Sequence, residues 1–202
     1  MAGDQRPDLL PTLIADWRRA FEAPDLPFLV VQLANFGPVA KAPTQSAWAE
    51  LREAQRQTVN NDPKTGLAVA IDFGDRVDIH PTQKAVVGQR LALAARKVAY
   101  GENIISRGPQ PVAVARNGAD IVITFDSALQ TYSSAQAIGF EVCDADKACR
   151  FATADVAGTQ VTLKAANTPQ AQFVRYAWAD APYVNLYSAQ DLPAIPFEVA
   201  IP

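Results

Sequence analysis

The sequence has few of the residues that build metal centres and nucleic-acid interfaces. Its 202 residues include one histidine and two cysteines, and 19% are charged, with a formal net charge of -3. That charged share lies below the usual value of about a quarter, and Lys and Arg form no cluster, so we expect no nucleic-acid partner. One histidine far from two thiols is a poor ligand set, so we expect no metal and no cofactor.

Long hydrophobic runs are also absent. No apolar run reaches the roughly 18 residues that a membrane helix needs, which argues against a membrane partner. The N-terminal segment MAGDQRPDLL is polar and lacks the apolar core of a signal peptide, so we expect no export signal within this chain. The hydrophobic share of 49% still suffices for a core in one large or two small domains.

The two cysteines leave more than one interpretation open. Cys143 and Cys149 flank the segment DADKA. A disulfide across a hairpin is expected if the protein meets an oxidising compartment, and two free thiols at a strand end are the alternative.

The first hundred residues predict alternating strands and helices. Apolar residues at three- and four-residue spacing predict helices over 8–21, 46–59 and 82–100, with Gly101 as a left-handed cap. The charged residues of the second helix are expected to be solvated: Glu50, Arg52, Glu53 and Arg56. The runs FLVVQLA (28–34) and LAVAI (67–71) are typical of strands covered on both faces in a parallel sheet. This pattern indicates an α/β layer.

The pattern changes at Ser106-Arg107-Gly108-Pro109. Six short strands are predicted beyond it, at 112–115, 121–125, 138–142, 160–163, 173–178 and 197–201, with a tight turn at Asn117-Gly118. This spacing favours a small β-sandwich or jelly roll. We therefore expect a domain of residues 1–107 and a second of residues 108–202.

The single histidine lies in the segment IDFGDRVDIHPTQKA, between a predicted strand and a predicted helix. Pro81 suits the first turn of that helix, and sites in open α/β sheets gather at the carboxyl ends of strands. Asp75 and Asp78 precede His80, and a carboxylate that accepts from one ring nitrogen leaves the other free as a base. The alternative is a surface histidine near a helix start. Asn35, at the end of the preceding strand, is either a ligand-binding residue or a loop cap.

Several stretches together resemble the sialate O-acetylesterase family of carbohydrate esterases. They are LLPTLIADWRRAF, PFLVVQLANF, WAELREAQ, GLAVAIDFGDRVDIHPTQKAVVGQRLALAARKVAYG and VRYAWADAPYVNLYSAQDLPAIPF, with a Gly-Pro at the domain joint. The resemblance implies part of an SGNH-type α/β hydrolase layer, followed by a β-rich domain. It also implies a serine esterase that removes acetyl groups from a sugar or glycan, in a periplasmic, secreted or lysosomal setting.

The resemblance assigns the catalytic histidine to His80. The wider SGNH group carries Asp-x-x-His, whereas here the aspartate stands two residues before His80. Asp78 is therefore the first candidate for the third triad member and Asp75 the second. The family's Gly-Gln-Ser-Asn block with the nucleophile does not occur in the sequence. We therefore expect the C-terminal portion of an esterase, inactive alone, whose partner is the N-terminal half of the catalytic domain.

Two other functions remain open at this point. The β-rich half carries Tyr132, Tyr176, Trp178, Tyr183 and Tyr187, which could bind glycans by stacking, although packing in a core is the commoner use of such rings. The absent nucleophile is also compatible with an inactive scaffold.

Overall fold

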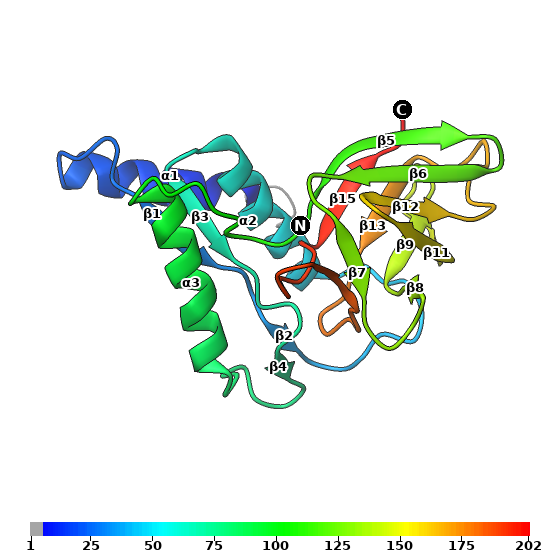
Figure 1. Cartoon of the computed structure of the whole chain (residues 1–202), viewed down its shortest axis with the longest axis horizontal. Coiled ribbons are helices and arrows are strands. Elements are labelled where there is room, and N and C mark those ends of the chain that lie inside the picture. The colour runs from blue at the N-terminus through cyan, green and yellow to red at the C-terminus, as the bar shows by residue number, and fades with distance from the viewer. Residues whose placement is uncertain (1–5) are drawn as a thin grey trace.

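The structure, a computed structural model, describes residues 6–202 and combines a helical part with a β-rich part (Figure 1). The polar N-terminal residues 1–5, on which part of the export-signal prediction rests, lie outside the described residues. None of the described helices is long and apolar enough to cross a membrane.

The helical part is built around two parallel strands. Strands β1 (Phe28–Val31) and β3 (Thr65–Ala68) pair in parallel. Helix α3 (Lys84–Val98) packs against β3, where Gly66 approaches Ala94 closely, while α2 (Ala47–Asn61) contacts the other face through Val59 and Leu67. Helix α1 (Arg6–Ala20) packs on α2. Two short parallel strands, β2 (Asn35–Phe36) and β4 (Gly74–Asp75), follow β1 and β3.

The β-rich part consists of antiparallel strands. Five of them form one sheet in the order β5 (Pro111–Asn117), β6 (Asp120–Phe125), β12 (Gln160–Leu163), β11 (Ala154–Ala157) and β8 (Gln136–Ala137). Four form a second sheet in the order β10 (Cys149–Phe151), β9 (Phe140–Cys143), β13 (Phe173–Tyr176) and β15 (Phe197–Ala200). Strands β7 (Leu129–Thr131) and β14 (Leu186–Ser188) pair separately. Both large sheets contribute apolar side chains to one buried cluster.

The fold confirms a mixed α/β protein with few helices and several antiparallel sheets. The three predicted helices and eight predicted strands are present, the turn at Gly118 has the expected left-handed backbone, and so does Gly101 after α3. Helix α3 begins at Lys84, so Pro81 lies before its first turn, because a bend in which Lys84 N–H donates to the Thr82 carbonyl intervenes.

Strand β1 is less covered than the sequence predicts. Leu29 and Val31 are each 40% exposed, and β1 pairs only with β3 among the described residues. The prediction that this strand is covered on both faces is therefore wrong for the described structure, whereas β3 is fully buried.

The guanidinium group of Arg52 joins the two parts of the protein. It is fully buried and donates to the carbonyl oxygens of Leu33 and Ala34 at the end of β1, at 2.8 and 2.9 Å, and to those of Ala179 and Asp180 in the β-rich part, at 2.6 and 2.9 Å. Burial lowers the pKa of Arg52 to about 9, although Asp180 nearby opposes this change. A charge that is satisfied by so many acceptors can remain buried.

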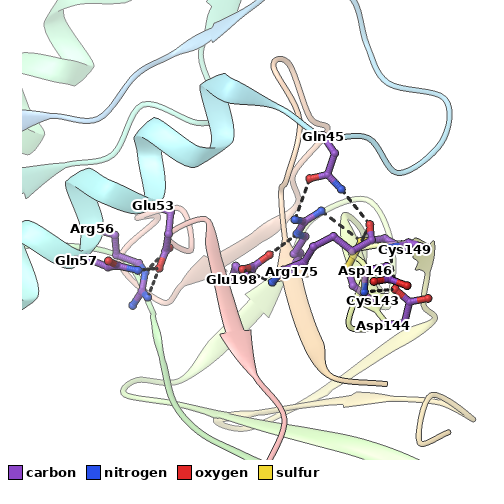
Figure 2. A network of polar contacts seen from close by, with 12 residues as sticks. Gln45, Glu53, Arg56, Gln57, Cys143, Asp144, Asp146, Cys149, Arg175 and Glu198 are labelled. Atoms are coloured by element: carbon purple, nitrogen blue, oxygen red, sulfur yellow. Dashed lines mark hydrogen bonds and ion pairs between the residues drawn. A yellow bond between two sulfur atoms is a disulfide. The ribbon is translucent and has the colours of Figure 1, made fainter. Parts of the chain in front are cut away.

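Further polar contacts lie along the same joint (Figure 2). Arg175 of β13 donates to Glu198 of β15 at 2.7 Å and to Gln45, just before α2, at 3.1 Å, while Arg56 and Glu53 pair within α2. The prediction that Arg52, Glu53 and Arg56 are solvated is wrong, because this side of α2 faces the β-rich part and buries all three.

A disulfide links Cys143 to Cys149 across β9 and β10, which settles the alternatives for these cysteines in the structure. Glu141 lies beside it on the covered outer face of this sheet. Burial raises the pKa of Glu141 to about 7, and the charge of Arg175 partly opposes that rise.

We predict that replacing Arg52 by Met lowers the free energy of unfolding by about 3 kcal/mol or more, because four buried or half-buried carbonyl groups lose a charged donor. Urea unfolding measures this loss. The control is Arg19→Met, whose guanidinium pairs with Asp16 on the surface, and it is expected to change stability by less than about 0.5 kcal/mol. A loss for Arg52→Met no larger than that of the control would contradict the role of Arg52 at the joint.

We predict that Glu141→Gln stabilises the protein at high pH only. The carboxyl ionises near 4.5 when unfolded and near 7 when folded, so the folded state holds its proton longer and stability falls as pH rises between these values. The amide of the Gln variant does not ionise, so the variant avoids that loss. Its free energy of unfolding, relative to that of the unaltered protein, therefore increases with pH by up to about 3 kcal/mol. Glu102→Gln is the control with the opposite sign, since Arg96 lowers the pKa of Glu102. Equal pH profiles for the Glu141→Gln variant and the unaltered protein, from urea unfolding, would refute the prediction.

Candidate active site

The candidate site lies on the loop that leaves the parallel strands. After β3 the chain passes through β4 and reaches His80 before it enters α3. Asn35 N–H donates to the Phe73 carbonyl at 2.8 Å, and Gly74, with φ +133°, lies so close to Asn35 that a side chain at position 74 would clash. The backbone of this loop is therefore fixed against β2, at the carboxyl end of the parallel pair.

The structure brings Asp78 and His80 together. Asp78 Oδ1 lies 2.9 Å from His80 Nδ1 and also accepts the backbone N–H of His80 at 2.8 Å. These two bonds, the backbone one first, lower the pKa of Asp78 below its ordinary value. Because Nδ1 contacts Asp78, Nε2 is the ring nitrogen that remains for another partner. The imidazole side chain is 81% exposed to solvent. An aspartate on Nδ1 is the arrangement that orients a histidine as a general base.

Asp75 does not contact the imidazole in this structure. Its carboxylate accepts the backbone N–H groups of Val77 and Asp78, at 2.8 and 3.3 Å, and so shapes the turn that presents the histidine. Of the two predicted partners of His80, only Asp78 lies within hydrogen-bonding distance. The catalytic roles of His80, Asp78 and Asp75 remain predictions.

A buried ion pair that the sequence analysis did not single out holds the start of this loop. Arg90 of α3 binds both carboxylate oxygens of Asp72, at 2.7 and 2.8 Å, and also donates to the Val69 carbonyl. Tyr187 of the β-rich part approaches Asp72 at 3.5 Å. Burial, followed by the charge of Asp72, raises the pKa of Tyr187 to about 12. These residues anchor the loop to both parts of the protein.

Asn35 acts as a structural link in the described structure. Its side-chain N–H groups donate to the carbonyls of Ile71 at 2.8 Å and Pro182 at 3.3 Å, and its Oδ1 accepts from Arg52 at 3.3 Å. The predicted role of Asn35 in substrate binding is untested, and these contacts already engage its amide.

A cleft of about 250 Å³ lies where the loop meets the β-rich part. Its lining includes Asn35, Asp72 and Asp75 from one side and Tyr183 and Tyr187 from the other. Arg76 in the loop donates to the Tyr183 hydroxyl at 2.8 Å across the mouth of the cleft. The β-rich part thus forms one wall of a cleft that the start of the His80 loop also lines, whereas Asp78 and His80 themselves lie outside its lining. Spacing in the sequence could not reveal this contribution.

We predict that Asp78 sets the tautomer of His80. At a pH where the ring is neutral, the proton is expected on Nδ1 in the unaltered protein, and Asp78→Asn is expected to lose this preference because an amide can also donate. Since the chain has a single histidine, its ¹⁵N shifts in a long-range ¹H–¹⁵N correlation report the tautomer without assignment. Asp75→Asn serves as the matched control. An unchanged tautomer in Asp78→Asn would contradict the role of Asp78 in orienting His80. A tautomer that changes only in Asp75→Asn would make Asp75 the orienting carboxylate instead.

Comparison with known proteins places these features in context. Residues 110–201 match the model of the sialate O-acetylesterase C-terminal domain. The chain is 32% identical to sialate O-acetylesterase of Mus musculus, covering 94% of this chain and 40% of that protein, and 32% identical to the Homo sapiens protein, with 93% and 41% covered. The crystal structure of a carbohydrate acetylesterase from Xanthomonas citri superposes with a TM-score of 0.87 at 39% identity, covering 96% of this chain and 46% of that one.

The chain therefore spans about 40% of the length of the curated relatives that it matches. The matched stretch includes both the helical part with His80 and the β-rich part. The predicted resemblance to the C-terminal portion of the sialate O-acetylesterase family is thereby confirmed.

Proposed function

We propose that this chain supplies the histidine-bearing portion of an esterase that hydrolyses acetyl esters on sugars. The observation that carries the proposal is the contact between Asp78 and His80 Nδ1 at 2.9 Å, in a loop that follows parallel strands. Similarity to a carbohydrate acetylesterase over both parts of the chain supports the same reaction class.

The proposed reaction follows the serine-esterase scheme. A serine from an upstream portion of the protein attacks the acetyl carbon, and His80 Nε2 takes the hydroxyl proton while Asp78 holds the imidazolium. His80 then donates this proton to the sugar oxygen as the ester bond breaks. Water, with its proton taken by His80, then attacks the acetyl-enzyme, and His80 returns that proton to the serine oxygen as the acetyl–serine bond breaks and acetate leaves.

We also propose the finer architecture that the resemblance implies. Strands β1 and β3 with their helices would form part of an SGNH-type layer, and the two large antiparallel sheets would form a jelly-roll domain. A boundary near residue 107 is supported by the change from helices to antiparallel strands there. The two parts nevertheless share buried apolar contacts, since Val59 and Leu67 belong to the same cluster as Ile121.

An uncovered apolar surface on the helical part supports an upstream partner portion. Leu9, Leu13 and Trp17 recur at four-residue spacing on α1 and are exposed, as is Phe21 beyond it. The free edge of β1 offers backbone groups to a further strand. Exposed apolar side chains and a free strand edge both favour association, so we infer that the rest of the catalytic domain packs here.

The alternative functions receive less support. Tyr176 and Trp178 are buried, and the rings of Tyr132 and Tyr187 meet edge to face at 71°, so the five aromatic residues do not form a flat exposed platform for a glycan. An inactive scaffold remains the alternative if no hydroxyl nucleophile is supplied to His80.

We predict that the chain alone hydrolyses 4-nitrophenyl acetate no faster than background, because loss of a triad member costs roughly four to six orders of magnitude. Fusion to an upstream family portion that carries the Gly-Gln-Ser-Asn block is expected to restore turnover. In that fusion, His80→Ala is expected to remove about 10³-fold or more of kcat/KM.

Lys97→Ala, an exposed change in the last turn of α3, is the matched control for the fusion and is expected to retain activity. His80-dependent turnover by the chain alone would show that the site is complete without an upstream portion. An active fusion that is indifferent to His80→Ala would remove His80 from the mechanism.

A further inference from the structure

A cavity of about 530 Å³ opens in the β-rich part of the protein. It lies between β8, β9, the segment that joins β10 to β11 and residues 177–183, and Ala40 closes one side. This volume falls within the range of small-molecule sites. Pro182 and Tyr183 line both this cavity and the cleft near His80, so an occupant of the cavity would lie beside that cleft.

Most buried residues of the cavity lining are small, apart from Phe140, Glu141 and Trp178, and two further rings in the lining are half exposed. Ala137, Ala154, Ala177 and Ala179 are buried and leave the space open. Gly139, with φ +87°, lies beside the Tyr183 backbone, where a side chain would be strained and close to the carbonyl oxygen. At the rim, Phe151 is 50% exposed and Tyr183 is 62% exposed. Two half-exposed rings beside a shallow apolar floor offer surfaces for the C–H face of a sugar ring.

The polar groups of the lining carry no positive charge. Among the lining residues there is neither Lys nor Arg, and Glu141 is the one carboxylate. Arg175 lies over the Trp178 ring at 4.5 Å and its charge acts on Glu141, but it is engaged by Glu198 and Gln45 and does not line the cavity. An anionic ligand would therefore face no cation among the lining residues, and an ionised Glu141 would repel it.

Two buried polar atoms of the cavity wall have no hydrogen-bond partner within the described residues. They are Glu141 Oε2, an acceptor, and Trp178 Nε1, which can only donate. A sugar hydroxyl both donates and accepts, so it can serve either atom once one of the two side chains rotates towards the cavity. Such unpaired buried groups are uncommon and favour a polar occupant over a purely apolar one.

We propose that this cavity binds a neutral pyranose residue and discriminates against anionic sugars. One face of the ring would stack against Phe151 and Tyr183 above the alanine floor, and its hydroxyl groups would face Glu141, Trp178 and the polar side chains of Ser134, Gln136 and Thr153. The inference does not rest on the proposed esterase function, because sugar binding needs neither His80 nor a nucleophile.

The test compares N-acetylglucosamine with N-acetylneuraminic acid, since both carry an acetamido group and only the second is anionic. Saturation-transfer NMR on the full chain at pH 8, above the pKa of about 7 of Glu141, is expected to show binding of the neutral sugar. Titrations at the same pH are expected to show at least about tenfold weaker binding of the anionic one. Phe151→Ala and Tyr183→Ala are each expected to weaken neutral-sugar binding about fivefold. Glu141→Gln is expected to reduce the difference between the dissociation constants of the two sugars.

Tyr100→Ala is the matched control, because Tyr100 is 77% exposed at the end of α3 and does not line the cavity. It is expected to leave sugar binding unchanged. The proposal is overturned if neither sugar binds, if both bind equally, or if Phe151→Ala and Tyr183→Ala have no larger effect than Tyr100→Ala. Capture of hexanol without capture of the neutral sugar would assign an apolar occupant and would also overturn it. None of these results depends on esterase activity, so a failure here leaves the fusion experiment unaffected.

Discussion

The architecture depends on one charged group that has no contact with water. A guanidinium is costly to bury unless its donors are satisfied, and Arg52 meets that condition with carbonyl groups from two distant segments. Each of those carbonyls would itself be costly to bury unpaired. The joint is therefore mutually dependent: the helical part needs the segment around Ala179 to solvate Arg52, and that segment needs Arg52 to satisfy its backbone.

The same joint determines the shape of both concave surfaces. Arg52 and Ser46 bind Ala179 and Asp180, and the chain continues from there to Pro182 and Tyr183, which line the cleft and the cavity together. The β-rich part is thus more than an appended module, because its segment 177–183 forms a wall beside the loop of His80. Because Pro182 and Tyr183 line both surfaces, a change in this segment would alter the cleft and the cavity together.

The sequence reveals local contacts well and distant ones poorly. Asp78 and His80 are two residues apart, so their pairing could be anticipated, and periodicity located every helix to within a few residues. Arg52 could not be recognised in this way, because its partners lie up to 128 residues away and its position on α2 fits a solvated face equally well. The short strands β2 and β4 also escaped prediction, since two residues carry no periodic signal.

Under the proposed function, packing of an upstream portion would explain why both His80 and the apolar side chains of α1 are exposed in this chain. An imidazole and a carboxylate in open water interact weakly, because the high dielectric screens them, and a general base gains power when water is excluded. An upstream portion packed against α1 and the free edge of β1 would bury the apolar side chains there, and its continuation over the carboxyl ends of the strands would cover the ring. Hydrophobic burial would then drive assembly at one surface and create the low dielectric that the pair of Asp78 and His80 requires at another. Catalysis would in this way depend on the same assembly event that completes the core.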